Sequence, residues 1–141
     1  MIHQKLHQLL TEDLLPILCI GETIDERNSG QTKVVLERQL NIACENLDSS
    51  SLNKMVIAYE PVWAIGTGVT ATTEMVAETH GAIRNILSVI GLNGDEISIL
   101  YGGSVSDDNA ASLSAIEDVD GFLIGGASLD VEKFYSIYNQ L

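Results

Sequence analysis

The chain has 141 residues, of which 45% are hydrophobic, enough for one folded domain with a core of its own. Its formal net charge of −13 argues against nucleic acid or an anionic membrane as a partner, because both would repel an acidic surface. No apolar run is long enough to span a bilayer and the first residues do not resemble a secretory signal, so we expect a cytoplasmic protein. A small anionic substrate is compatible with this charge, since backbone N–H groups can hold it.

Four short apolar runs, each followed by a helical pattern, make up most of the chain. Strands are predicted at residues 15–20, 55–59, 97–101 and 121–124. Helices are predicted at about 32–47, 72–90, 107–113 and 130–141, and residues 2–10 are predicted to be the tail of an earlier helix. Runs without polar alternation are typical of parallel strands covered on both faces. The alternation of strands and helices predicts a β/α barrel or a doubly wound sheet, and four units are half of a closed barrel of roughly 250 residues.

Capping residues mark the predicted helix starts. Thr32, Thr72 and Asp130 are predicted N-caps. The Asp107–Asp108 pair is predicted to cap the short helix after the third strand. The apolar stripe of the last helix is predicted to consist of Val131, Phe134, Tyr138 and Leu141.

The cysteines and histidines give no sign of a metal site. Cys19 and Cys44 lie in apolar surroundings without metal-type spacing, so we expect two buried free thiols. His3, His7 and His80 fall within helical patterns rather than at strand ends, and we interpret them as structural or exposed.

Glu60 is the strongest candidate for a catalytic residue. It ends the second apolar run, and Pro61 keeps it extended rather than helical. A carboxylate at the end of a buried strand is partly desolvated, which strengthens it as a general base. Taken alone, Glu60 could equally be a surface glutamate in an ion pair.

The residues after Glu60 predict a lid. They are apolar although they form a loop, and a proline and two glycines flank them as hinges. A loop of this kind can close beside a carboxylate and expel water, although a loop packed permanently on a helix is the alternative. Glu22 could accept a hydrogen bond from the indole of this loop and hold the lid, or it could cap a helix. The lid segment, residues 61–68, consists of Pro61, Val62, Trp63, Ala64, Ile65, Gly66, Thr67 and Gly68.

Two glycine-containing loops follow the last two strands directly. Gly102-Gly103-Ser104 follows the third strand, and Gly125-Gly126 follows the fourth. Glycines let backbone N–H groups approach a ligand closely, and the serine adds a hydroxyl. Each loop alone could be an ordinary tight turn, but together, on consecutive strand ends, they favour a phosphate site.

These segments resemble the triosephosphate isomerase family in order and spacing, over essentially the whole chain. The resemblance implies an α/β fold, a parallel (β/α) half-barrel that is the C-terminal half of a TIM (β/α)8 barrel, strands 5 to 8. Residues 1–141 would form that single half and begin in the helix after strand 4. The matching segments are Cys19-Ile20-Gly21-Glu22, Ala58 to Gly68, Tyr101-Gly102-Gly103-Ser104-Val105 and Asp120 to Leu129.

The resemblance also implies roles for individual residues. Glu60 would move a proton between adjacent carbons of glyceraldehyde 3-phosphate and dihydroxyacetone phosphate, without a cofactor. Tyr101 and Ser104 would hold the closed lid, and Arg84 would pair with Asp120. The residues implied to bind the substrate phosphate are Gly66, Ser104, Gly125 and Gly126.

The chain departs from the family pattern in what it lacks. The family has a lysine at the end of strand 1 and an electrophilic histidine at the end of strand 4, and neither has a counterpart here. A smaller departure is Thr73, where the family usually has a proline. We therefore expect a truncated isomerase sequence that is poorly active alone, with a non-catalytic, self-associating half-barrel that at most binds phosphate as the alternative. The expected partners are a small phosphorylated triose and a second copy, as a homodimer or as self-associating half-barrels, with no nucleic acid and no membrane.

Overall fold

The computed structural model describes residues 1–65 and 70–141, and its centre is one four-stranded parallel sheet. The strands are β1 (Ile17–Ile20), β2 (Val56–Tyr59), β3 (Ile99–Tyr101) and β4 (Gly121–Phe122). They lie in the order β1-β2-β3-β4, so every strand pairs with its neighbour along the chain. A doubly wound sheet reverses its strand order near the middle, whereas the wall of a β/α barrel does not. The sequential order therefore favours the barrel over the doubly wound alternative.

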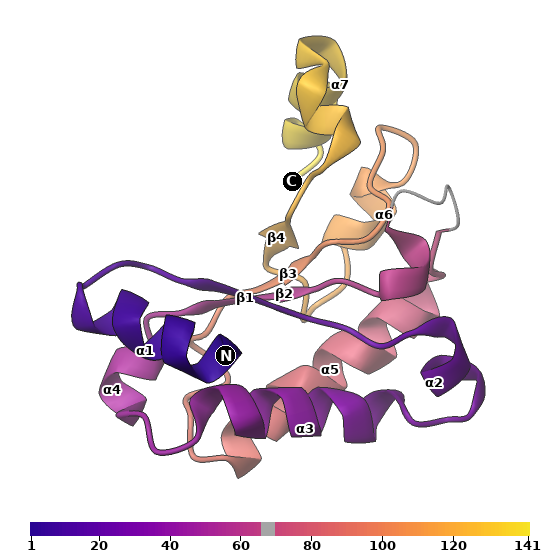
Figure 1. Cartoon of the computed structure of the whole chain (residues 1–141). Coiled ribbons are helices and arrows are strands. Elements are labelled where there is room, and N and C mark those ends of the chain that lie inside the picture. Colours follow the sequence, from indigo (N-terminus) through magenta and orange to yellow (C-terminus); the bar gives the residue numbers. More distant parts are fainter. Residues whose placement is uncertain (66–69) are drawn as a thin grey trace.

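Helices occupy every connection between the strands (Figure 1). α1 (Ile2–Thr11) precedes the sheet, and α2 (Ile24–Asn28), α3 (Thr32–Cys44) and α4 (Ser49–Leu52) connect β1 to β2. The 3₁₀ helix η1 (Val62–Ala64) and α5 (Thr73–Val89) connect β2 to β3, and α6 (Ala110–Ser114) connects β3 to β4. A second 3₁₀ helix, η2 (Gly126–Leu129), and α7 (Val131–Tyr138) follow β4. None of the helices in the described ranges is both long enough and apolar enough to cross a membrane.

The core lies between one face of the sheet and the two longest helices, α3 and α5. These helices run side by side below the sheet in Figure 1 and contact each other directly. Leu36 and Leu40 lie one turn apart on α3, and Ile83 and Leu87 lie one turn apart on α5, because residues four apart share a helix face. All four are fully buried and belong to one cluster with Ile57 of β2. This layer fixes the strands, and with them the strand ends that carry the candidate site.

The opposite face of β1 is open. Leu18 and Ile20 are buried, whereas Ile17 is 49% exposed and Cys19 is exposed as well. The described residues thus cover the apolar run of β1 on one face only, and the prediction that Cys19 is buried is wrong. Cys44 is partly buried, and both thiols are free, as predicted. The side chains of β1 are apolar on both faces of the strand, and the described residues cover one of these faces.

Helix α7 also presents apolar side chains that the described residues leave open. In Figure 1 it stands apart from α3 and α5, and Ile137 is its one buried residue. Its C-terminal end is tied to α6, because the side-chain oxygen of Gln140 accepts a hydrogen bond from the Ala111 N–H at 3.1 Å. The predicted stripe is present but 45% to 83% exposed, at Val131, Phe134, Tyr138 and Leu141.

The helix caps agree with the sequence in two places and differ in two. Thr72 and Asp130 are confirmed as N-caps, because each side chain accepts backbone hydrogen bonds from the first turn of α5 or α7. Thr32 is instead the first residue of α3, because the helix begins one residue earlier than predicted, with Gln31 in the N-cap position. The Asp107–Asp108 pair does not cap α6, which begins after Asn109, because residues 106–109 form a turn of their own.

We predict that the 141-residue chain by itself forms dimers or larger species at micromolar concentration. Within the described residues, β1 and β4 each have one unpaired edge, and the apolar side chains of β1 and α7 are exposed. Burying roughly 400 Å² of apolar surface favours association by on the order of 10 kcal/mol before entropy costs. Light scattering on freshly purified protein measures the species present. A well-folded, monodisperse monomer that binds no hydrophobic dye would contradict this prediction.

His80 of α5 is a titratable group inside the core. It is fully buried, its ring lies edge-on to Tyr59 with 5.7 Å between centroids, and Nδ1 lies 3.0 Å from the carbonyl oxygen of Asp118. Burial lowers the pKa of His80, and the hydrogen bond to Asp118 partly offsets this effect. The folded chain therefore keeps His80 neutral, with Nδ1–H donating to the carbonyl.

We predict that the free energy of unfolding falls as the pH drops through about 6.5, the usual pKa of histidine in an unfolded chain. Below that pH the unfolded chain binds a proton that the folded chain resists. His80→Asn should reduce the stability lost between about pH 7.5 and about pH 5.5, whereas His7→Asn, at an exposed position of α1, should not. Urea unfolding followed by tryptophan fluorescence measures both. The same pH dependence in wild type and His80→Asn would show that another group controls it.

Candidate active site at the strand ends

The residues predicted to act on a substrate come together at the carboxyl ends of β2, β3 and β4. Glu60 follows β2, the loop Gly102–Ser104 follows β3, and Gly125 and Gly126 follow β4. They line one hollow of about 350 Å³. The loops that directly follow parallel strands all emerge at the carboxyl end of the sheet, which is why three segments distant in sequence meet here.

Glu60 is half-buried, and two glycines make room for it. Its N–H donates to the carbonyl of Ile20 at 2.7 Å, just beyond the last residue of β2. A β-carbon at Gly21 would lie 2.6 Å from the carbonyl carbon of Glu60, and one at Gly102 would lie 2.6 Å from its Cγ. Real β-carbons do not approach other atoms this closely. A larger residue at either position would therefore displace Glu60, so the two glycines determine where the carboxylate stands.

The glycine loops contribute backbone donors to the lining of the hollow. Within residues 1–65 and 70–141, the N–H groups of Ser104, Gly125 and Gly126 have no hydrogen-bond acceptor. The Ser104 hydroxyl is engaged, because it donates to the carbonyl of Ala64 at 2.9 Å and so connects the loop after β3 to the lid segment. The lining contains no lysine, arginine or histidine among the described residues. An anion in this hollow would be held by backbone dipoles.

The lid segment is described as far as residue 65. Pro61 and Ala64 are buried, whereas Val62 is 52% and Ile65 is 46% exposed. The described part is thus packed against the protein on one side only. Three residues predicted in the lid segment lie outside the described residues: Gly66, Thr67 and Gly68.

A buried carboxylate connects the lid segment to the sheet. Glu22 is fully buried and accepts hydrogen bonds from the Trp63 indole at 3.2 Å and from the Tyr59 hydroxyl at 3.1 Å. Arg27 pairs with the same carboxylate at 3.0 Å and lies over the Trp63 ring, 5.6 Å from its centroid. Burial, together with the Glu22 charge, raises the pKa of Tyr59, so its hydroxyl stays protonated. Glu22 was predicted either to accept a hydrogen bond from the indole or to cap a helix. Thr23 caps helix α2, and Glu22 accepts the hydrogen bond from the indole.

Two further residues named by the family resemblance do not line the hollow. Tyr101 is fully buried, and a side chain at Gly103 would collide with its hydroxyl. Burial raises the pKa of Tyr101. Arg84 pairs with Asp120 at 2.9 Å, as the resemblance implies, and also with Asp118 at 3.1 Å.

Two neighbours of the site are not evident from the sequence. Cys19 lies beside Glu60, and burial, followed by the charge of Glu60 and a hydrogen bond to it, raises the pKa of the thiol. Arg27 reaches Glu22 because α2 forms, and α2 begins with a capping box between Thr23 and Glu26. The spacing Thr-x-x-Glu is a known helix-start signal and could have indicated α2.

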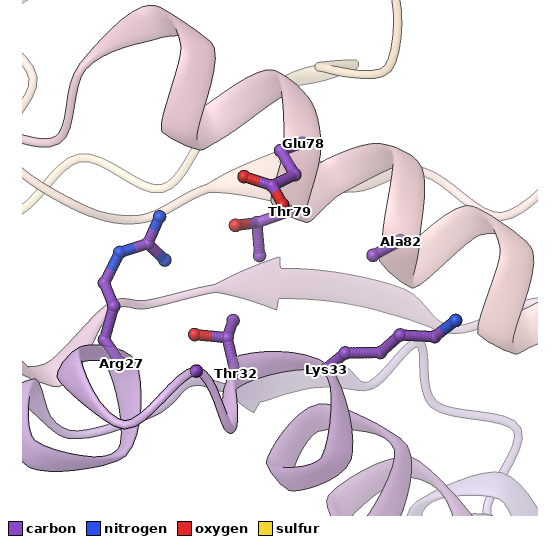
Figure 2. A pocket seen from close by; sticks show the side chains of 7 residues that line it. Arg27, Thr32, Lys33, Glu78, Thr79 and Ala82 are labelled. Carbon is purple, nitrogen blue, oxygen red and sulfur yellow. The ribbon is translucent and has the colours of Figure 1, made fainter.

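A second hollow, of about 280 Å³, lies between α2, α3 and α5. Figure 2 shows Arg27 and Lys33 on one side of it and Glu78 and Thr79 of α5 on the other. Its charges are of both signs, and Arg27 is already paired with Glu22. We therefore assign the candidate site to the strand-end hollow. Across the described ranges, no group of three or more His, Cys, Asp or Glu side chains is arranged to hold a metal ion.

The sequential parallel sheet, with a carboxylate and two glycine loops at its carboxyl end, defines an α/β protein of the β/α-barrel type. The family model described as triosephosphate isomerase matches residues 1–141, and the chain belongs to the triosephosphate isomerase family. It is 47% identical over 140 residues to triosephosphate isomerase of Francisella tularensis subsp. holarctica strain LVS, and 44% identical to that of Francisella philomiragia. The protein of the same name from Mycoplasmoides gallisepticum is 46% identical over 139 residues. These matches cover 97% to 99% of this chain but 55% of each relative, so the chain spans about half the length of the relatives it matches.

We predict that Glu22→Leu lowers the free energy of unfolding by about 3–5 kcal/mol, the usual cost of removing one partner of a buried ion pair. The substitution leaves Arg27, whose side chain is only 14% exposed, without this carboxylate, and it removes the acceptor that Trp63 and Tyr59 share. Emission from Trp63, the only tryptophan of the chain, should shift as well. Urea unfolding and fluorescence measure the two effects.

The matched control is Glu78→Leu, at an exposed position of α5, which should change neither quantity. If Glu22→Leu costs no more than this control, the contacts of Glu22 do not hold the segment in place.

Proposed function

We propose that residues 1–141 are the C-terminal half of a triosephosphate isomerase barrel, strands 5 to 8, beginning in the helix after strand 4. The proposed reaction interconverts glyceraldehyde 3-phosphate and dihydroxyacetone phosphate. The observation that carries the proposal is that Glu60 shares one hollow with the glycine loops after β3 and β4. A base held close to an anion-binding backbone can act on a small phosphorylated triose in a fixed orientation.

Glu60 is the proposed general base. Its carboxylate takes a proton from the carbon next to the substrate carbonyl and returns it to the neighbouring carbon, so aldose and ketose interconvert without a net change in oxidation state and without a cofactor. The reaction passes through an enediolate whose negative charge has to be stabilised. In the family this is the role of a lysine and a histidine that have no counterpart in this chain. The chain therefore carries the base, and the charge-stabilising side chains have to come from elsewhere.

The substrate phosphate is proposed to bind the backbone of the glycine loops. Two observations support this role for Ser104, Gly125 and Gly126. Their N–H groups have no acceptor in the described part of the chain, and they line the same hollow as Glu60. Gly66 is proposed for the same role on the family resemblance alone. Backbone donors carry no formal charge, so such a site is compatible with a chain of net charge −13.

Residues 61–68 are the proposed lid, with Glu22 and Tyr101 as its support. The proposal is supported by the exposed apolar side chains of Val62 and Ile65 beside the hollow and by the hydrogen bond from Trp63 to Glu22. Closing an apolar loop over the base would exclude water and strengthen the interactions of the developing charge. For the complete protein we propose a cytoplasmic homodimer, because the family is generally dimeric and glycolytic, with no nucleic acid or membrane as a partner.

We predict that Glu60→Gln lowers kcat by about 10²–10⁴ in a complete barrel, since this is what a general base typically contributes. The barrel is completed by joining this chain to the part of the Francisella tularensis relative that it does not match. Inhibition by inorganic phosphate should be unchanged, because the proposed cradle uses other residues. Steady-state assays measure both. The second comparison is between the completed barrel and the unjoined 141-residue chain. Turnover by the unjoined chain should be lower by at least about 10², because it lacks both charge-stabilising side chains.

Glu78→Gln serves as the matched control for Glu60→Gln. Full turnover in Glu60→Gln would make Glu60 an ordinary strand-end carboxylate. A completed barrel without any turnover, but with phosphate binding, would instead favour the second candidate function, a non-catalytic half-barrel. The open faces of β1 and α7 are the observation in favour of that candidate.

A further inference from the structure

Gln39 of α3 makes a double hydrogen bond to one residue at the end of β1. Its side-chain oxygen accepts from the Gly21 N–H at 2.9 Å, and its side-chain nitrogen donates to the Gly21 carbonyl at 2.9 Å. A primary amide offers a donor and an acceptor side by side, so it pairs with a peptide unit as a neighbouring strand would. Asn41, two residues along the same helix, bonds instead to the Glu37 carbonyl within α3.

Gly21 is the point at which the backbone of β1 meets Glu60. The register between β1 and β2 ends with Ile20 opposite Tyr59, so Gly21 is the first residue beyond the ladder. Its α-carbon lies so close to the Glu60 carbonyl that no side chain fits there. The hydrogen bonds from Gln39 thus connect helix α3 to the backbone of Gly21, which lies directly against Glu60.

Glu22, the next residue along the chain, is hydrogen-bonded to the start of the lid segment. The backbone carbonyl of Glu22 accepts from the Val62 N–H at 3.1 Å, and its side chain accepts from the Trp63 indole at 3.2 Å. Residues 21–22 therefore contact both Glu60 and the start of the lid segment. Gln39 anchors this pair of residues and does not itself line the strand-end hollow.

We propose that Gln39 is a positioning residue, which sets the Glu60 carboxylate and residues 62–63 at the start of the lid segment relative to each other by fixing the backbone of Gly21. The proposal rests on the proposed function of Glu60. Within the described residues, the side-chain hydrogen bonds of Gln39 go to Gly21 and not to Glu60 or to residues 61–65. Leucine at this position has a similar size but no polar atoms, so it removes both bonds with little change in volume.

The test uses the completed barrel, with any tryptophan of the added segment replaced by phenylalanine, so that Trp63 is the only emitter. In Gln39→Leu we expect kcat to fall by about 10- to 100-fold, because small displacements of a catalytic group are costly, while KM and inhibition by inorganic phosphate change by less than about 3-fold. Trp63 emission should shift. Gln39→Glu, which can still accept from the Gly21 N–H, should give an intermediate kcat. Asn41→Leu should match the wild type in every measurement.

All assays are run at a temperature at which circular dichroism shows every variant folded, so that loss of folded protein does not mimic loss of rate. A Gln39→Leu variant with a lower melting temperature but wild-type kcat has lost only a structural contact, and this result overturns the proposal. If the wild-type barrel has no turnover, the proposed function fails, and Trp63 emission then decides about Gln39. Emission that shifts in Gln39→Leu but not in Asn41→Leu supports the anchoring of residues 21–22, and unchanged emission overturns it.

Discussion

The buried ion pair between Glu22 and Arg27 is the interaction on which the geometry of the strand ends depends. Taking a carboxylate out of water costs several kcal/mol unless it is paired and hydrogen-bonded, and Glu22 is fully buried. Two further donors, Tyr59 and Trp63, complete its surroundings. Because each donor comes from a different segment, the carboxylate is satisfied only when β2, α2 and the lid segment are all in place. A desolvated charge therefore fixes a geometry that apolar packing alone would leave looser.

The glycines around Glu60 also fix the geometry of the site, because they leave no room for side chains. Gly21 and Gly102 leave no space for a side chain, so the backbone on either side of Glu60 can approach it closely. Hydrogen bonds then hold that close approach, from Gln39 on the helix side and from the sheet ladder through Ile20. The backbone around Glu60 is thus held both by close main-chain contacts and by the side chain of Gln39. The proton transfer proposed for Glu60 requires such a fixed geometry, because it takes place over a short distance.

The sequence was sufficient for features that depend on neighbouring residues. The apolar runs indicated the four strands of the sheet, Pro61 indicated where the second strand ends, and Asp130 was correctly predicted as the cap of the last helix. It was insufficient where a contact depends on which faces meet. The bond from Gln39 to Gly21 joins residues 18 positions apart, and it forms only because α3 packs across the end of β1.

Exposure was the second quantity that local sequence could not supply. An apolar strand residue looks the same whether its face is covered or open, and β1 and α7 both have faces that the described residues do not cover. Cys19 illustrates the consequence. It has the sequence surroundings of an inert core thiol, yet it lies exposed beside Glu60, because the open face of β1 is also the face next to the proposed base.

Charge places the last constraint on how such a site can work. A chain of net charge −13 repels the proposed phosphorylated substrate at long range, and the strand-end hollow has no cationic side chain among its described lining residues. Attraction has to come from backbone N–H groups, whose dipoles act only over a few Å and only in the right orientation. Glycine loops provide that orientation, since they bring main-chain atoms to the ligand without intervening β-carbons. In the proposed function, holding the phosphate and stabilising the enediolate are then separate tasks, and the roles proposed for the glycine loops and for Glu60 are the first task and the proton transfer.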